Sequence, residues 1–147
     1  MLIKNSTCIV LFVIINIRSL SERLRIEMDE KSGVEITWQE GVGIAAFSAA
    51  SICDSEVIAA ISSRIKGFID ESRPRAVIFD FEMVKFFSSQ LLGVLLDVRA
   101  KAELYDVKVV ISGINPQLYR VFRITNLDKI FRFFPDKESA VRAVNAN

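Results

Sequence analysis

The sequence predicts a single α/β domain: a mostly parallel mixed β-sheet with helices packed on it. Its 147 residues suit one compact domain and are too few for two ordinary ones. Short apolar runs alternate along the chain with segments whose apolar residues recur at helical spacing. The resulting order of elements is β-β-α-β-α-β-α-β-α. Strands separated by helices favour right-handed crossovers, and therefore parallel neighbours in the sheet.

The first elements are a hairpin and a helix. Residues 34–40 alternate apolar and polar side chains, as a half-buried strand does, and residues 42–47 form the second strand after a glycine-containing turn. Asp54 is a suitable N-cap for a helix that continues to about Asp70. The apolar residues of this helix fall on one face: Val57, Ile58, Ile61, Ile65, Phe68 and Ile69.

The middle of the chain alternates buried strands with a second helix. Residues 76–81 and 107–111 are nearly all apolar, which is typical of strands covered on both faces. Between them, residues 84–89 lead into a helix at about 90–104. Leu92, Leu95 and Leu96 are its predicted core stripe. Two i,i+4 ion pairs are expected on its outer side: Asp97/Lys101 and Arg99/Glu103.

Two helices and a strand complete the domain. Asn115 is the expected cap of a short helix with Pro116 at its first position, and the inward pair of that helix is Leu118 and Phe122. A strand at 130–134 follows, and Asp136 caps a terminal helix.

Residues 1–27 are predicted to be an extension outside the domain, which occupies residues 28–147. The apolar run Cys8–Ile17 is about half as long as the roughly 20 residues of a membrane-spanning helix, so no stable membrane span is expected. A signal or membrane-surface segment, and an extra strand or helix of the domain, are the alternatives. A translation start at Met28 would also fit.

The composition favours a binding protein over an enzyme. The chain has no histidine, the commonest general base and transition-metal ligand, so we expect no catalytic residue, metal or cofactor. Cys8 and Cys53 form neither a zinc framework nor a disulfide scaffold, which fits a cytoplasmic location. A net charge of +1 gives little attraction for phosphates, so nucleic-acid binding is not expected.

The candidate functional site is the strand-to-helix turn Phe87-Ser88-Ser89. A serine hydroxyl can cap the free N–H groups of the first helical turn. The same N–H groups and the positive end of the helix dipole also suit a phosphate. Capping alone and phosphorylation therefore stay open as alternatives. Strand alternation puts one of Phe86 and Phe87 in the core, so at most one of them is exposed.

Asp80 also has two interpretations, because it ends a buried strand. It either bonds neighbouring backbone groups or accepts a phosphoryl group, as in response-regulator receivers. Receivers need an adjacent acidic pair to hold Mg²⁺, and no such pair follows the first strand here. The structural role is therefore the favoured one.

Several motifs occur in a characteristic order from Val77 to Ala143. They are Ile78-Phe-Asp80, Val84-Lys-Phe-Phe87, Ser88-Ser89, Leu92-Gly93-Val-Leu-Leu96, Val109-Val-Ile-Ser-Gly113, Asn115-Pro116, Val121-Phe-Arg-Ile-Thr-Asn-Leu-Asp128, Ile130-Phe131 and Glu138-Ser-Ala140. This stretch resembles the STAS domain of bacterial anti-sigma-factor antagonists, with a looser likeness that extends over about residues 34–144. The resemblance implies a STAS fold and a protein that takes part in transcription regulation and signal transduction through protein–protein interaction.

The resemblance also implies a partner and a modification. The partner would be an anti-sigma factor that is a serine kinase of the histidine-kinase ATPase fold. The Asp-Ser-Ser-Gly turn of these antagonists corresponds here to Ser88, Ser89, Gln90 and Leu91. Ser89 is thus the phosphorylation candidate, with Ser88 second, and the implied partner-binding residues are Phe87, Ser88, Ser89, Gln90 and Leu91. The alternatives are an unphosphorylated STAS scaffold in a signalling or lipid-transport complex, and a receiver-like phosphotransfer protein that uses Asp80.

Overall fold

The computed structural model describes residues 33–146, so the expectations for residues 1–27 lie outside it. The strands are β1 (Val34–Gln39), β2 (Val42–Phe47), β3 (Ser51–Ile52), β4 (Ala76–Asp80), β5 (Phe86–Phe87), β6 (Lys108–Ser112) and β7 (Arg132–Phe134). The helices are α2 (Ser55–Ser72), α3 (Ser89–Glu103), α4 (Pro116–Ile124), the 3₁₀ turn η2 (Leu127–Lys129) and α5 (Lys137–Asn145). Within this part of the chain, no helix has the length and apolarity that a bilayer crossing requires.

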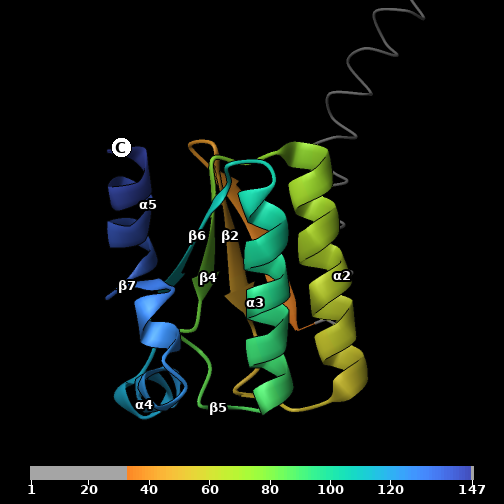
Figure 1. Ribbon diagram of the computed structural model, residues 1–147, viewed down its shortest axis with the longest axis vertical. Coiled ribbons are helices and arrows are strands. Elements are labelled where there is room, and N and C mark those ends of the chain that lie inside the picture. The colour runs from red at the N-terminus through yellow and green to blue at the C-terminus, as the bar shows by residue number, and fades with distance from the viewer. Residues whose placement is uncertain (1–32, 147) are drawn as a thin grey trace, which may run out of the picture.

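Five strands form the central sheet in the order β1-β2-β4-β6-β7 (Figure 1). β1 pairs antiparallel with β2, and each later neighbour pairs in parallel. The mixed, mostly parallel sheet and the order of its elements are therefore confirmed. Two short strands, β3 and β5, form a separate parallel pair. The strand at Phe86–Phe87 agrees with the predicted strand-to-helix turn, whereas neither β3 nor the pairing was indicated by the sequence pattern.

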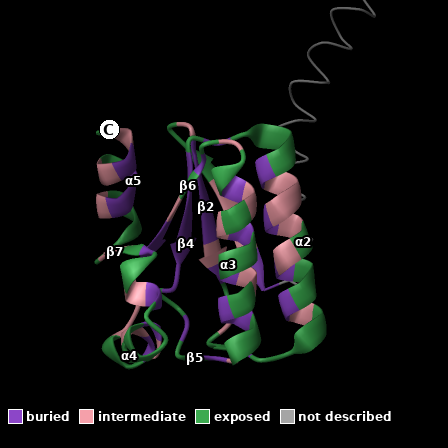
Figure 2. Ribbon diagram, in the orientation of Figure 1, coloured by how far each residue is buried: buried purple, intermediate pink, exposed green. Residues whose placement is uncertain are grey.

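Side-chain alternation along the strands divides the core between the two faces of the sheet. In β4, Val77 and Phe79 contribute to a large apolar cluster with α2, α3 and α4, whereas Ile78 belongs to a smaller cluster with α5. Figure 2 shows β4 buried between the helical layers, while the outer faces of α2 and α3 are exposed. The predicted burial of this strand on both faces is confirmed.

Three helices begin at the predicted N-caps. Asp54 Oδ1 accepts from the N–H of Glu56 at 2.8 Å, and the carboxylate also accepts from Val57. Asn115 Oδ1 accepts from the Leu118 N–H at 2.9 Å, and Pro116 occupies the first position of α4 as expected. In α5, Asp136 Oδ1 accepts from the Ser139 N–H at 2.7 Å.

The predicted core stripe of α3 is partly wrong. Leu92 and Leu95 are buried, but Leu96 is 37% exposed. The buried residues recur at heptad-like spacing and include Leu91, Val98 and Ala102. Leu96 follows a core position by one residue, about 100° around the helix, and so turns away from the core.

Two surface details also differ from expectation. Arg99 pairs with Glu103 at 2.9 Å as predicted, but Lys101 bonds to Asp70 on the neighbouring helix instead of Asp97. Residues Leu127–Lys129 wind into η2, so the last strand begins at Arg132 rather than at residue 130.

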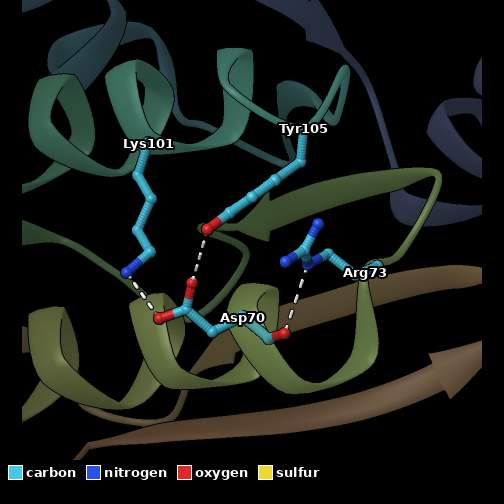
Figure 3. Close-up of polar contacts among 4 residues, drawn as sticks. All are labelled: Asp70, Arg73, Lys101 and Tyr105. Atoms are coloured by element: carbon cyan, nitrogen blue, oxygen red, sulfur yellow. Dashed lines mark hydrogen bonds and ion pairs between the residues drawn. The ribbon is translucent and has the colours of Figure 1, made fainter.

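A polar cluster joins the C-terminal ends of α2 and α3 (Figure 3). Asp70 Oδ2 accepts from Lys101 Nζ at 2.6 Å, and Asp70 Oδ1 accepts from the Tyr105 hydroxyl at 3.1 Å. Arg73 donates from Nε to the Asp70 carbonyl at 3.3 Å, and its guanidinium carbon lies 3.6 Å from the Tyr105 ring centroid. The hydrogen bond from Lys101 is the main reason why the pKa of Asp70 lies below its ordinary value.

Candidate functional site

The predicted turn lies where β5 enters α3, and its backbone is held by hydrogen bonds to the segment around β3. The N–H groups of Lys85 and Phe86 both donate to the Ala50 carbonyl, at 2.8 and 3.0 Å. The Ser88 N–H donates to the Ile52 carbonyl at 2.9 Å. The course of the chain at this turn is therefore determined by a neighbouring strand more than 30 residues earlier in the sequence.

An aromatic cluster of Phe81, Phe87 and Phe122 supports the turn from within the core. The Phe87 centroid lies 6.0 Å from each of the other two rings, in edge-to-face arrangements. Phe87 is only 7% exposed, whereas Phe86 is 59% exposed. The prediction that strand alternation buries one of these phenylalanines is confirmed.

The two serines of the turn have different environments. Ser88 is the N-cap of α3 by backbone geometry, but its Oγ is buried without a hydrogen-bond partner. The expected side-chain cap is therefore not formed; the Leu91 N–H bonds instead to the backbone carbonyl of Ser88 at 3.1 Å. Ser89 is the first residue of α3 and is exposed.

The residues implied as a partner-binding surface do not all reach that surface. Ser89 and Gln90 are exposed, and Ser88 is partly buried. The side chains of Phe87 and Leu91 lie in the core, so they support the surface and cannot themselves contact a docked protein. Phe87 is buried because its ring packs against the rings of Phe81 and Phe122.

Exposed apolar side chains beside the turn extend the candidate surface. Met83 is 61% exposed in the loop before β5, and Phe86 is 59% exposed within it. The alternation rule could select one phenylalanine, but the sequence alone did not say which one. Met83 carried no pattern that would have marked it.

The N-terminal end of α2 lies beside the same turn. The Ser55 hydroxyl donates to Gln90 Oε1 at 3.0 Å, which links the first turns of α2 and α3. Figure 1 shows these two helix ends side by side, next to the label of β5. Sequence reasoning missed Ser55, because a hydrogen bond across 35 residues leaves no local signal.

Asp80 lies at the carboxyl end of β4, on the sheet face that α5 covers. It is 5% exposed, and its Oδ1 accepts from the Glu82 N–H at 3.1 Å. Burial raises the pKa of Asp80 above its ordinary value. It borders a cavity of about 380 Å³ together with Gly113 and the start of α5.

The receiver-like interpretation of Asp80 gains no support from this geometry. The hydrogen bond from Glu82 is the backbone contact that the structural role predicts. Across residues 33–146, no group of three or more His, Cys, Asp or Glu side chains could hold a metal ion. Nothing in the described part of the chain therefore supplies the Mg²⁺ ligands of a receiver.

A model of the STAS domain matches residues 34–140, which include the whole sheet and the turn before α3. The chain belongs to the STAS domain family. The order of strands and helices described above is thus that of a STAS fold, as the sequence motifs indicated.

Solved structures with this fold include several anti-sigma-factor antagonists. The unphosphorylated form of SpoIIAA is 16% identical; the alignment covers 78% of this chain and 97% of SpoIIAA, with a TM-score of 0.69. The phosphorylated form of SpoIIAA, from Bacillus, aligns at 16% identity over 75% and 98% of the two chains, with a TM-score of 0.59. An antagonist from Mycobacterium paratuberculosis is 24% identical over 76% and 92% of the chains, with a TM-score of 0.67.

The same fold occurs outside the antagonists. A sulfate transporter family protein from Wolinella succinogenes is 17% identical, with coverage of 75% of this chain and 89% of the other and a TM-score of 0.62. At these identities the similarities establish the fold of this STAS domain. A comparison with curated protein sequences finds no match.

Proposed function

We propose that this STAS domain is a cytoplasmic, non-enzymatic antagonist of an anti-sigma factor, and that phosphorylation of Ser89 switches off its binding. The observation that carries the proposal is the contrast between the two serines. Ser89 is exposed at the first position of α3, whereas the Ser88 hydroxyl is buried. A kinase can therefore reach Ser89 without rearranging the turn, and Ser88 is the less suitable acceptor.

The surface around Ser89 suits protein binding. The backbone hydrogen bonds to β3 and the buried ring of Phe87 already hold the turn in place, so little conformational entropy is lost on docking. Phe86 adds an exposed aromatic side chain, a residue type enriched at protein–protein interfaces. The proposed partner is an anti-sigma factor that is also a serine kinase of the histidine-kinase ATPase fold.

Phosphorylation would act through charge, with no change of fold. A phosphate adds about −1.5 to −2 charges to Ser89 at neutral pH. Burying these charges in an interface without a cationic partner costs several kcal/mol, and each 1.4 kcal/mol weakens binding about tenfold. A partner that tolerates the neutral hydroxyl would therefore be released by the phosphorylated form.

The experiment incubates the full chain with candidate anti-sigma-factor kinases and labelled ATP. We expect an acid-stable label that Ser89→Ala abolishes. Ser88→Ala is the matched control and should keep the label, because the Ser88 hydroxyl makes no hydrogen bond whose loss would disturb the turn. A binding assay with the labelling kinase should then show that Ser89→Asp binds more weakly than the wild-type protein.

Other outcomes would support other functions. If no kinase labels the protein and Ser89→Asp binds its partner as the wild-type protein does, the switch is wrong. An unphosphorylated scaffold in a signalling or transport complex would then be favoured, in line with the occurrence of the fold in a sulfate transporter family protein. A Mg²⁺-dependent label that disappears in Asp80→Asn would favour the receiver-like function.

A further inference from the structure

The segments that enter α2 and α3 run in matched register. Ile52 pairs with Phe87 in the parallel β3–β5 ladder. Three residues further along both segments, Ser55 is hydrogen-bonded to Gln90 at 3.0 Å. The same 35-residue offset holds at both contacts.

This register brings Asp54 opposite Ser89. Both residues lie between the two contacts, one position before Ser55 and Gln90, respectively. The ladder ends at Ile52 and Phe87, and beyond it the Ser55–Gln90 bond again joins the two segments. Asp54 and Ser89 are both exposed, so their side chains share the solvent-facing rim of the site.

The position of Asp54 is well determined because its carboxylate caps α2. Oδ1 accepts from the N–H groups of Glu56 and Val57, at 2.8 and 3.3 Å. These two bonds hold the carboxylate at the start of α2 and prevent it from swinging freely away from the turn. Asp54 thus keeps a localised negative charge at the first turn of α2.

We propose that Asp54 is a specificity-determining residue of the Ser89 site: its carboxylate faces Ser89 across the β3–β5 register and governs the charge state of a phosphate carried there. The inference rests on the proposed function, in which Ser89 is the modified residue. It adds the prediction that the site carries a fixed negative charge before modification, so a partner presents a basic or hydrogen-bond-donating group to Asp54. A phosphate on Ser89 then meets a like charge from a different helix.

The charged or titratable groups closest in sequence to Asp54 and Ser89 are Glu56 in the first turn of α2, Cys53 after β3, and Lys85 before β5. The first turn of α3 carries no acidic residue. Glu56 does not share the register position of Asp54, and Lys85 is four residues from Ser89 along an extended segment. The separation across the β3–β5 register is below the Debye length of about 8–10 Å at physiological salt, so the coupling to Asp54 survives screening.

The test measures the second pKa of phosphoserine at position 89 by ³¹P NMR. Phosphoserine is installed during translation of the full chain, and the ³¹P shift is followed as the pH is varied. In Asp54→Asn we expect a second pKa lower by about 0.5, because a like charge within one Debye length in a high-dielectric setting disfavours the dianion by roughly that much. Asparagine is as good an N-cap as aspartate, so α2 keeps its first turn.

Two variants make the result specific. Asp136→Asn changes the equivalent cap of α5, which packs on the opposite face of the sheet, and should leave the phosphate pKa unchanged. Glu56→Gln should give a smaller shift than Asp54→Asn. An unchanged pKa in Asp54→Asn, or a larger shift in Glu56→Gln, would overturn the proposal.

This experiment and the kinase assay fail independently. The phosphate is installed without a kinase, so the NMR titration reports on Asp54 whether or not a kinase modifies Ser89. If the titration shows coupling but no kinase labels the protein, the proposal for Asp54 is supported and the phosphorylation switch is wrong. If a kinase labels Ser89 but the titration shows no coupling, the switch is supported and the proposal for Asp54 is wrong.

Discussion

The two ends of the α2–α3 pair are built differently. At the C-terminal end, Asp70 ties Lys101 and Tyr105 to α2, and Arg73 covers the Tyr105 ring (Figure 3). At the N-terminal end, the side-chain link found within residues 33–146 is the hydrogen bond from Ser55 to Gln90. Asp70 bonds to Lys101 and Tyr105 across the two helices at the first end, whereas Ser55 and Gln90 form the link at the second.

This difference shows that the backbone of a site can be held in place by buried contacts while its side chains stay exposed. The N-terminal end is held from below, by backbone bonds to β3 and by the aromatic cluster around Phe87. Its outer side chains, including Phe86 and Ser89, are exposed. A partner can then use these side chains without first breaking internal bonds. At the C-terminal end, Asp70 is already bonded to Lys101 and Tyr105.

The largest effect is expected when the aromatic cluster is removed. Phe87→Ala deletes a buried ring and should lower the free energy of unfolding by about 3–5 kcal/mol. Phe86→Ala, at the neighbouring exposed position, should change it by no more than about 0.5 kcal/mol but weaken partner binding. Urea unfolding measures both variants. Equal destabilisation by Phe87→Ala and Phe86→Ala would mean that burial of the Phe87 ring does not stabilise the turn.

A smaller effect is expected at the cap of α2. Asp54→Ala removes the acceptor for the N–H groups of Glu56 and Val57, which should cost about 1 kcal/mol. Asp54→Asn retains the cap and should be close to the wild-type protein in urea unfolding. If the asparagine variant is as unstable as the alanine variant, charge rather than capping governs this helix end.

The stability contributed by Asp70, at the C-terminal ends of α2 and α3, should depend on pH. Because the pKa of Asp70 is lowered in the folded protein, its ionised form stabilises the fold above the unfolded pKa of about 3.9. This stabilisation is lost as the pH falls through the lower, folded pKa. Asp70→Asn should therefore be modestly less stable than the wild-type protein at pH 7, and the difference should shrink in acid. Urea unfolding between neutral and acidic pH measures this difference.

Asp97→Asn is the control for that series. Asp97 is an exposed residue whose carboxylate lies 3.9 Å from Lys66, and such pairs contribute little. Its removal should leave stability almost unchanged at every pH. A response as large as that of Asp70→Asn would indicate a general effect of surface charge instead of the Asp70 cluster.

The smallest effect is expected at Ser88. Its buried hydroxyl has no hydrogen-bond partner, so Ser88→Ala should change the free energy of unfolding by no more than about 0.5 kcal/mol. Thermal unfolding compared with Asp54→Ala sharpens the contrast between the caps of the two helices. A loss near 1 kcal/mol would show that the Ser88 hydroxyl does cap α3 in solution.

Patterns of short range predicted most of the fold. The hairpin of β1 and β2, the capping residues Asp54, Asn115 and Asp136, and the buried strand β4 each follow from alternation, helical spacing or the chemistry of a single side chain. Such signals lie within a few residues of one another and do not depend on which other elements pack nearby.

The features that the sequence patterns did not predict depend on contacts between segments that are distant in the sequence. β3 has two residues, and it forms a strand because it pairs with β5 across the fold. Lys101 lies one helical turn from Asp97, yet it bonds to Asp70 because α2 packs beside α3. Leu96 is as apolar as Leu95, but it is exposed because it lies on a face of α3 that does not pack against the core.

At the candidate site, sequence patterns predicted that a strand ends in two serines before an apolar helix, and that one of two adjacent phenylalanines is buried. Only the packing of the whole domain shows that the Ser88 hydroxyl is buried and Ser89 exposed, that Leu91 is in the core, and that Ser55 bonds to Gln90. The difference lies in the sequence separation of the residues that interact. Strand and helix periodicity is a property of neighbouring residues, whereas exposure and cross-strand proximity arise only when segments 35 residues apart pack together.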